Sequence, residues 1–351
     1  MKKYSEVLQM IEAPNQKVID ECRTRWDCIA KPLYSLGKLE EGIIKISGIL
    51  GTARFDLHKK ALVIMCADNG VVAEGVTQTG SEVTAIVSEN FLEMKSCACV
   101  MAKQIGAEVF PIDIGINRDT RLPGDKKIGY GTKNIAIEPG MTREEAICGI
   151  EVGINTVFDL KEQGYHIIAT GEMGIGNTTT SSAIAAVLLG LPVETVTGKG
   201  AGLSKEGLIR KIEVIKRAID INQPDRTDPI DVLSKVGGFD IAGMVGLCLG
   251  GASAKIPIVL DGFISSIAAL IAVRIEPTVY HYLLPSHASK ENAGLLTLEA
   301  LGLRPYLTLD MCLGEGTGAI ALYPLLDMAL AVYNEMSTFE QIEIEAYQPL
   351  S

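Results

Sequence analysis

Two glutamates stand alone in glycine-rich turns, where their carboxyl groups could perform acid–base chemistry. Glu172 belongs to the segment Gly171-Glu-Met-Gly-Ile-Gly-Asn-Thr-Thr179, and Glu315 belongs to Gly314-Glu-Gly-Thr-Gly318. Such a carboxylate is an ordinary solvated side chain when it faces water. In a cleft with apolar walls, burial raises the pKa of a carboxyl group toward neutrality, which suits it to proton transfer. Glu315 and Glu172 are therefore the candidate catalytic residues.

Glycine-rich turns also favour a ligand that carries a phosphate. Two further turns, Ala67-Asp-Asn-Gly70 and Gly198-Lys-Gly-Ala-Gly202, complete a set of four, and we expect each to follow a strand. Glycine lets backbone N–H groups approach a ligand, and a helix that begins directly behind the turn adds its N-terminal dipole. We expect Thr178 and Thr179 to cap such a helix. One turn of this kind is more often a tight connection, but four together favour a phosphate site.

Several other chemistries lack their residues. No segment reads GxxxxGK[ST], as a P-loop does, or GxGxxG, which argues against an NAD-dependent dehydrogenase. The eight cysteines include no CxxC pair, so we expect reduced, buried thiols rather than a zinc site. None of the histidines is spaced from a carboxylate in the sequence as metal ligands are; the four are His58, His166, His281 and His287. We expect no metal and no cofactor.

The elements predicted around these turns define an α/β fold. Residues 61–66 form a continuous apolar run typical of a parallel strand buried on both faces, and similar runs lie at 108–114, 165–170, 257–260, 278–284 and 306–309. Helical periodicity marks 82–104, 143–163, 179–189, 207–222 and 262–272. This alternation predicts a Rossmann-like parallel sheet with helices on both faces, and ligands of such sheets bind beyond the carboxyl ends of the strands.

The two chain ends are predicted to be helical. Residues 1–54 and 319–351 show no strand signal, so we expect them to form a small helical lobe beside a large α/β domain of residues 55–318. The chain has 351 residues, of which 32 are Lys or Arg and 43 are Asp or Glu, which gives a net charge of −11. This acidic balance argues against nucleic acid and anionic membranes as partners. Because the first residues lack the apolar core of a signal peptide, we expect a cytoplasmic protein.

The order of several motifs carries a family resemblance over nearly the whole chain. The sequence resembles the nicotinate-nucleotide–dimethylbenzimidazole phosphoribosyltransferases, which make the lower-ligand nucleotide of cobamides. The resemblance rests on Lys31-Pro-Leu-Tyr-Ser-Leu-Gly-Lys-Leu-Glu40, Gly171-Glu-Met-Gly-Ile-Gly-Asn-Thr178, Asp231-Val-Leu-Ser-Lys-Val-Gly-Gly-Phe-Asp240, Leu260-Asp-Gly-Phe263, Pro285-Ser-His287 and Leu313-Gly-Glu-Gly-Thr-Gly-Ala319.

The resemblance implies that a phosphoribosyl group moves from nicotinate mononucleotide to an aromatic base, with release of nicotinate and inversion of the anomeric carbon. The cationic pyridinium is already a good leaving group, so the reaction needs no magnesium–pyrophosphate machinery. The resemblance makes Glu315 the catalytic base and Glu172 a second active-site glutamate. Near the phosphoribosyl group it places Gly174, Asn177, Thr178, Lys211 and Ser289. The remaining residues expected to bind substrate are Thr79, Val87, Gly176, Gly200, Gly202 and Leu313.

One position departs from the family pattern and leaves the acceptor open. Well-known members carry a glutamine that faces the aromatic base, whereas here Val83-Thr84-Ala85-Ile86 is followed by Val87. A more apolar pocket makes other benzimidazoles, adenine or a phenolic ring alternatives to dimethylbenzimidazole. The family also implies a dimer with the site near its interface, and the partner could be identical or a paralogue. The alternative function is a non-catalytic, nucleotide-binding subunit, which the presence of Glu315 argues against.

Overall fold

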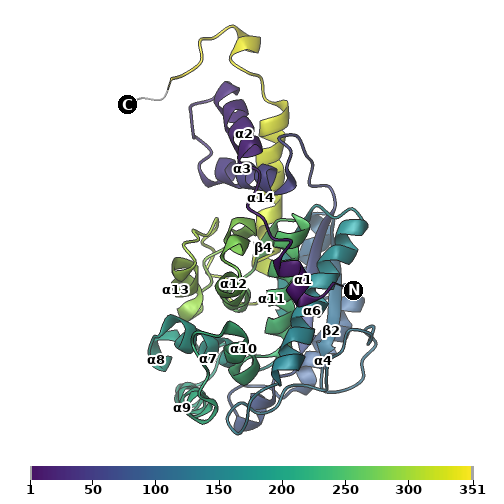
Figure 1. The fold of residues 1–351 in the computed structure, drawn as a ribbon, viewed down its shortest axis with the longest axis vertical. Helices are drawn as coiled ribbons and strands as arrows, with labels where there is room; N and C mark the ends of the chain where they lie inside the picture. Colours follow the sequence, from purple (N-terminus) through teal and green to yellow (C-terminus); the bar gives the residue numbers. More distant parts are fainter. Residues whose placement is uncertain (1, 349–351) are drawn as a thin grey trace.

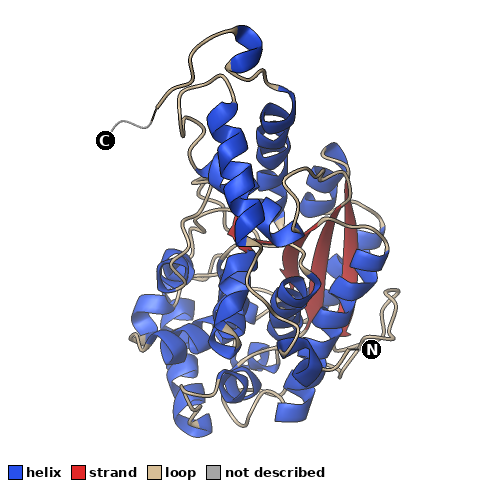
Figure 2. Cartoon of the chain, turned by 45° about the horizontal axis from the view of Figure 1, so that its top comes forward, coloured by secondary structure: helices blue, strands red, loops and turns tan. Residues whose placement is uncertain are grey.

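The computed structural model describes residues 2–348 and contains a parallel sheet between two layers of helices (Figures 1 and 2). The five strands lie in the order β2-β1-β3-β4-β5, and every neighbouring pair is parallel, which confirms the predicted fold class. The chain turns toward β2 after β1 and toward β5 after β3, so the order reverses between β1 and β3. Ligands of such sheets bind at this reversal. The strands are β1 (Lys60–Ala67), β2 (Ala107–Gly115), β3 (Ile167–Met173), β4 (Ile258–Leu260) and β5 (Leu283–Pro285).

Alternation along β1 divides the interior into two cores. Every residue of this strand is buried. Ala61, Val63 and Met65 face the first core, whereas Leu62 and Ile64 face the second. Because successive strand residues point to opposite faces, a run without polar interruption is what a sheet covered on both sides requires.

Two groups of helices cover these two faces (Figure 2). The first core is packed by α6 (Arg143–Glu162), α7 (Asn177–Leu189), α8 (Val193–Val196), α9 (Lys205–Asn222), α10 (Pro229–Val236), α11 (Phe239–Ala254), α12 (Phe263–Ile275) and α13 (Asn292–Ala300). The second core is packed by α2 (Gln16–Cys28), α3 (Lys38–Leu50), α4 (Glu82–Leu92), α5 (Cys97–Gln104) and α14 (Thr317–Glu335). The remaining helical elements are α1 (Tyr4–Leu8) and the 3₁₀ turns η1 (Gly70–Glu74), η2 (Pro277–Tyr282) and η3 (Glu340–Ile342). Among residues 2–348, no helix has the length and apolarity to cross a membrane.

Three predicted elements differ from the structure. Residues 82–104 form two helices rather than one, because Met94 takes the left-handed φ of +53° and Ser96 caps a new helix by accepting the Cys99 N–H. Most of 278–284 is the turn η2, since Pro277 begins a 3₁₀ helix and only its end enters β5. Residues 306–309 add a single bridge, from Leu307 to His287, instead of a strand.

The helices near the two chain ends lie side by side in part. Figure 1 shows α2 and α3 beside the far end of α14, where the Trp26 and Tyr333 rings are 5.1 Å apart and Arg25 donates to the Tyr333 carbonyl. In contrast, α1 packs on the α/β layers, since its buried Val7 joins the first core. The domain limits at residues 54 and 319 stay a prediction.

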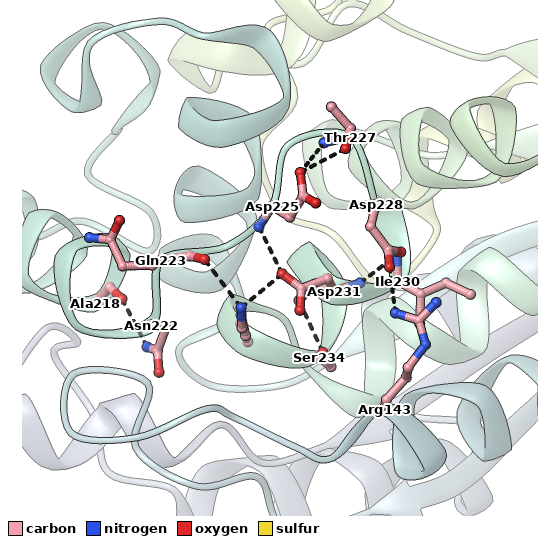
Figure 3. A network of polar contacts seen from close by, with 11 residues as sticks. Arg143, Ala218, Asn222, Gln223, Asp225, Thr227, Asp228, Ile230, Asp231 and Ser234 are labelled. Carbon is pink, nitrogen blue, oxygen red and sulfur yellow. Dashed lines mark hydrogen bonds and ion pairs between the residues drawn. The ribbon is translucent and has the colours of Figure 1, made fainter.

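A polar network joins the ends of α6, α9 and α10 (Figure 3). Asp228 caps α10 by accepting the Ile230 N–H at 3.0 Å, and it pairs with Arg143 of α6 at 2.6 Å. Asp231 accepts the Asp225 N–H at 2.7 Å and thereby closes the loop between α9 and α10. The network therefore sets the direction of α9, which presents Lys211 to the site.

Candidate active site

A cleft at the carboxyl ends of the strands gathers nearly all the predicted site residues. Its lining includes Glu172 and Glu315 together with Thr79, Val87, Gly174, Gly176, Asn177, Thr178, Gly200, Lys211, Ser289 and Leu313. Gly202 is the exception among them. Its carbonyl accepts a hydrogen bond from the Gln78 side chain at the rim, so it joins two loops and does not line the cleft.

Two walls of the cleft carry the two glutamates. We call residues 171–178 together with Lys211 the β3 wall, and residues 313–318 the α14 wall. Both segments line the same cleft. They touch where Gly171 packs on the backbone of Glu315: a Cβ added at Gly171 would lie 2.7 Å from the Glu315 carbonyl oxygen. Only glycine permits this approach, so Gly171 sets how closely the walls meet.

On the β3 wall, Glu172 is buried in a cluster of polar side chains. Strand β3 continues to Met173, further than the predicted end at residue 170, so Glu172 lies on the strand and not in the turn. Asn177 donates its side-chain N–H groups to Glu172 and, at 3.0 Å, to Asp240. Burial, and next the Asp240 charge, raise the pKa of Glu172 well above its usual range. Burial also raises the pKa of Asp240 to about 6. These surroundings therefore favour the protonated form of Glu172.

The start of α7 and Lys211 form a cationic corner in the same wall. Gly176, at φ +94°, is the N-cap, so the expectation that Thr178 and Thr179 cap this helix is wrong; both lie inside its first turn. Lys211 is 1% exposed and donates to the Thr178 hydroxyl at 2.8 Å and to the Gly198 carbonyl at 3.3 Å. Burial lowers the pKa of Lys211 to about 8. A helix N-terminus beside a cation suits a phosphate group.

On the α14 wall, the backbone is held in an uncommon conformation. Gly314, Glu315 and Gly316 have φ of +90°, +60° and +88° in succession. Glutamate rarely adopts a positive φ, so the surrounding contacts must hold it there. Asp261 supplies three of them: it accepts the N–H groups of Gly316 at 3.1 Å, Gly318 at 2.7 Å and Ala319 at 3.2 Å. This carboxylate caps α14 and fixes the residue before it.

Two of the four glycine turns do not follow strands. Residues 198–202 come after the short helix α8, and residues 314–318 come after the irregular segment that contains the Leu307 bridge. The strand-end expectation is thus wrong for both, although both line the cleft in part. The tertiary fold nevertheless brings both turns to the carboxyl edge of the sheet, where the other two turns directly follow β1 and β3.

Sequence reasoning assigned no role to Asp240, Asp261 or His287. His287, which sequence spacing separates from carboxylates, lies beside Asp261, and the two side chains fill the space next to Gly318. Burial raises the pKa of Asp261, opposed by the charge of His287 and by the three N–H groups. The family motifs in the sequence contain all three residues, but the spacing of those motifs does not show that the side chains lie close together.

Metal ligation and the thiols can be described directly. Within residues 2–348, no three His, Cys, Asp or Glu side chains gather as metal ligands would. All the cysteines are unpaired; Cys22, Cys66, Cys99 and Cys248 are buried. The expectation of buried thiols is wrong for the other four, which lie at helix ends, on outward helix faces or at the cleft: Cys28, Cys97, Cys148 and Cys312.

Apolar side chains line part of the cleft, and we call Val87, Met173 and Leu313 the apolar slot. Val87 of α4, Met173 at the end of β3 and Leu313 contribute to its surface, and Leu313 is 57% exposed. A flat aromatic ring would fit such a surface because it gains contact without needing polar partners. The fold and the site together define an α/β enzyme whose cleft is lined by a buried lysine beside a helix start, an apolar slot and two glutamates.

Comparisons with known proteins identify the family. A family model described as a phosphoribosyltransferase matches residues 11–344. The chain is 48% identical to the nicotinate-nucleotide–dimethylbenzimidazole phosphoribosyltransferase of Ruminiclostridium cellulolyticum, over 99% of both chains. It is 49% identical to the protein of that name from Acetivibrio thermocellus, over 98% of this chain and 99% of the relative. The crystal structure of CobT from Thermus thermophilus superposes with a TM-score of 0.89 at 38% identity, over 94% of this chain and 99% of that one. The chain belongs to this phosphoribosyltransferase family.

Proposed function

We propose that this enzyme transfers the phosphoribosyl group of nicotinate mononucleotide to an aromatic lower-ligand base, giving the α-ribotide and nicotinate for cobamide synthesis. The observation that carries the proposal is a single cleft that Glu315, the apolar slot and Lys211 all line. The names of the relatives in the two clostridial species agree with these substrates.

The reaction assigns a task to each wall. The phosphate of nicotinate mononucleotide would lie against Lys211 and the first turn of α7, with the remaining predicted binding residues around the ribose. The bond between the anomeric carbon and the pyridinium nitrogen breaks, and its electron pair neutralises the nicotinate ring. The acceptor atom bonds to the opposite face of the anomeric carbon. The proton of the acceptor, which an azole carries on its other ring nitrogen and a phenol on its oxygen, passes to Glu315. Glu172 would orient the ribose or the departing ring through its protonated carboxyl group.

The apolar slot supports a proposal for the acceptor. Val87 offers no hydrogen bond to a ring, so the slot selects by shape and surface more than by polar contacts. We propose a benzimidazole or related azole as acceptor, with adenine or a phenolic ring as the alternatives. A phenolic acceptor would attack through oxygen and would need the same base.

The assembly and surroundings of the enzyme are also proposals. We propose that it works in the cytoplasm as a dimer, either of identical chains or with a paralogue, and that residues 1–54 and 319–351 act as a lobe separate from 55–318. Large apolar side chains that the single chain leaves exposed, such as Tyr34 and Met328, are consistent with a covered surface in a dimer. Sedimentation of the purified protein would measure the oligomeric state.

The direct test is an assay of nicotinate release. The purified protein is incubated with nicotinate mononucleotide and each of dimethylbenzimidazole, benzimidazole, adenine and a phenol, and free nicotinate and the ribotide are measured by chromatography. We expect stoichiometric nicotinate and ribotide with at least one base. Binding of nicotinate mononucleotide without turnover on any base would instead support the non-catalytic subunit.

A further inference from the structure

The Glu315 carboxylate makes a hydrogen bond that links it to a different helix. Its Oε2 accepts the backbone N–H of Ala98 at 3.2 Å, in the first turn of α5. This is the only hydrogen bond recorded for the Glu315 side chain among residues 2–348, so its Oε1 has no partner there. One carboxylate oxygen is thus held by the protein, and the other remains available at the cleft.

The Ala98 N–H needs this partner. Ala98 is fully buried, and its N–H belongs to the first turn of α5, where no residue of the helix can accept it. Ser96 occupies the N-cap and accepts the Cys99 N–H at 3.1 Å, so the cap leaves the Ala98 N–H for another acceptor. A buried N–H without an acceptor is costly. The contact therefore restrains Glu315 as well as satisfying α5.

The position of α5 exists because the helix predicted over 82–104 is interrupted. The turn at Met94 ends α4 and lets α5 begin again at Cys97, with its first turn aimed at the α14 wall. Backbone N–H groups at a helix start favour a negative charge. On the opposite side, Asp261 holds the backbone of Gly316, so Glu315 is restrained from two directions.

We propose that the first turn of α5, through the Ala98 N–H, is the positioning group for the catalytic base: it holds Oε2 of Glu315 and leaves Oε1 to take the acceptor proton. The inference rests on the proposed function, because it assigns the proton to Glu315. Ala98 contributes only its backbone, so no side-chain motif could have indicated it.

The test removes this one N–H. Ala98→Pro keeps a residue that the first turn of a helix tolerates but lacks the donor. Cys97→Pro is the matched control, since Cys97 is exposed at the first helical position and its N–H has no recorded acceptor among the described residues. We expect Ala98→Pro to lower kcat about tenfold, as loss of one hydrogen bond to a charged group predicts, with KM for nicotinate mononucleotide nearly unchanged. Cys97→Pro should retain normal kcat.

A double-variant experiment separates positioning from a general structural effect. In the Glu315→Gln background, Ala98→Pro should have almost no further effect on kcat, because the base that it positions is gone. An equal loss of kcat in both backgrounds, or normal kcat in a folded Ala98→Pro enzyme, would overturn the inference. If Ala98→Pro does not fold, replacing Ala98 by its α-hydroxy acid removes the N–H without bulk, and the same outcomes apply. An unmodified enzyme that releases no nicotinate refutes the proposed function, whereas an active one with unaffected variants refutes only this inference.

Discussion

The two walls of the cleft hold their glutamates by opposite means. On the β3 wall, side chains surround a carboxyl group that is 7% exposed: Asn177 bonds to Glu172, and Asp240 lies beside it. On the α14 wall, the backbone holds a half-buried carboxylate, through three successive positive φ angles and the Ala98 N–H. Burial among other acids favours the protonated form of Glu172, whereas Glu315 is placed by contacts of the backbone.

This difference separates the roles of two chemically identical residues. Burial and neighbouring acids raise the pKa of Glu172, which favours its protonated form and hence a role as hydrogen-bond donor. Glu315 faces the same cleft without such a cluster around it. Enzymes often divide acid and base tasks between two carboxyl groups whose surroundings give them different pKa values.

The largest expected effect is that of Glu315→Gln. The amide cannot accept the acceptor proton, so kcat should fall by roughly 10²–10⁴-fold. Nicotinate mononucleotide binding, measured by calorimetry, should change little because Lys211 and the start of α7 lie on the other wall. Near-normal kcat with a saturating azole would assign the base to Glu172 or to an activated water.

Gly171→Ala should break the contact between the walls. The added Cβ would lie 2.7 Å from the Glu315 carbonyl oxygen and 3.0 Å from its carbonyl carbon, so the strained α14 wall must shift. Misplacing a catalytic group by a fraction of its contact distance predicts a loss in kcat of about 10- to 100-fold. Gly124→Ala is the control, since no atom lies within 4 Å of its Cβ position. Equal kcat in both variants would show that the walls act independently.

The β3 wall should give the enzyme a pH limit at its alkaline side. Lys211, with a pKa of about 8, is charged below that pH and neutral above it. The affinity for nicotinate mononucleotide should therefore be constant below pH 8 and fall by up to about tenfold per pH unit above it. Lys211→Arg stays charged, so its affinity should not decline in this range. Isothermal titrations from about pH 6.5 to about pH 9.5, a range around the pKa of Lys211, distinguish the unmodified enzyme from Lys211→Arg. A parallel decline in both would exclude Lys211 as the cause.

Glu172→Gln should have a smaller effect than Glu315→Gln. A protonated carboxyl group and an amide have the same shape, and the Gln oxygen can still accept from Asn177. We expect kcat to fall by less than about tenfold. A loss as large as that in Glu315→Gln would reverse the roles that the two walls suggest.

The smallest effect concerns selection of the acceptor. Val87→Gln adds an amide to the apolar slot and should raise kcat/KM for azoles relative to phenolics by about fivefold, the equivalent of one hydrogen bond. Competition between the two acceptor classes measures this ratio directly. An unchanged ratio would mean that Val87 does not face the ring.

Local sequence patterns were sufficient for much of the fold. The apolar run at 61–66 predicted a strand buried on both faces, and β1 is one. The helices 143–163 and 207–222 were predicted to within a few residues because they carry long periodic patterns. Shorter signals failed: 306–309 is as apolar as a strand but makes only one bridge at the sheet edge.

The candidate site was predictable in its glycines and glutamates but not in its supports. Glu172 and Glu315 attract notice because glycines flank them. Asp240, Asp261 and the Ala98 N–H act through contacts between residues far apart in the chain, such as the 3.1 Å bond from Gly316 to Asp261. Periodicity cannot reveal such contacts. The break between α4 and α5 at Met94 was also not predicted, because the helical spacing of apolar residues continues across it. Only the φ angle of Met94 marks the break.

Helix α14 has a mechanical consequence. Its 19 residues give a length of about 28 Å, from the cleft to the end that lies beside α2 (Figure 1). Asp261 clamps one end and the Trp26–Tyr333 contact clamps the other, while Pro324 removes an internal hydrogen bond between them. The helix is thus held in place at both ends and has one less stable turn between them. A displacement of its far end, whether by a substitution or by binding of another molecule, would therefore move the residues just before Thr317, which include Glu315.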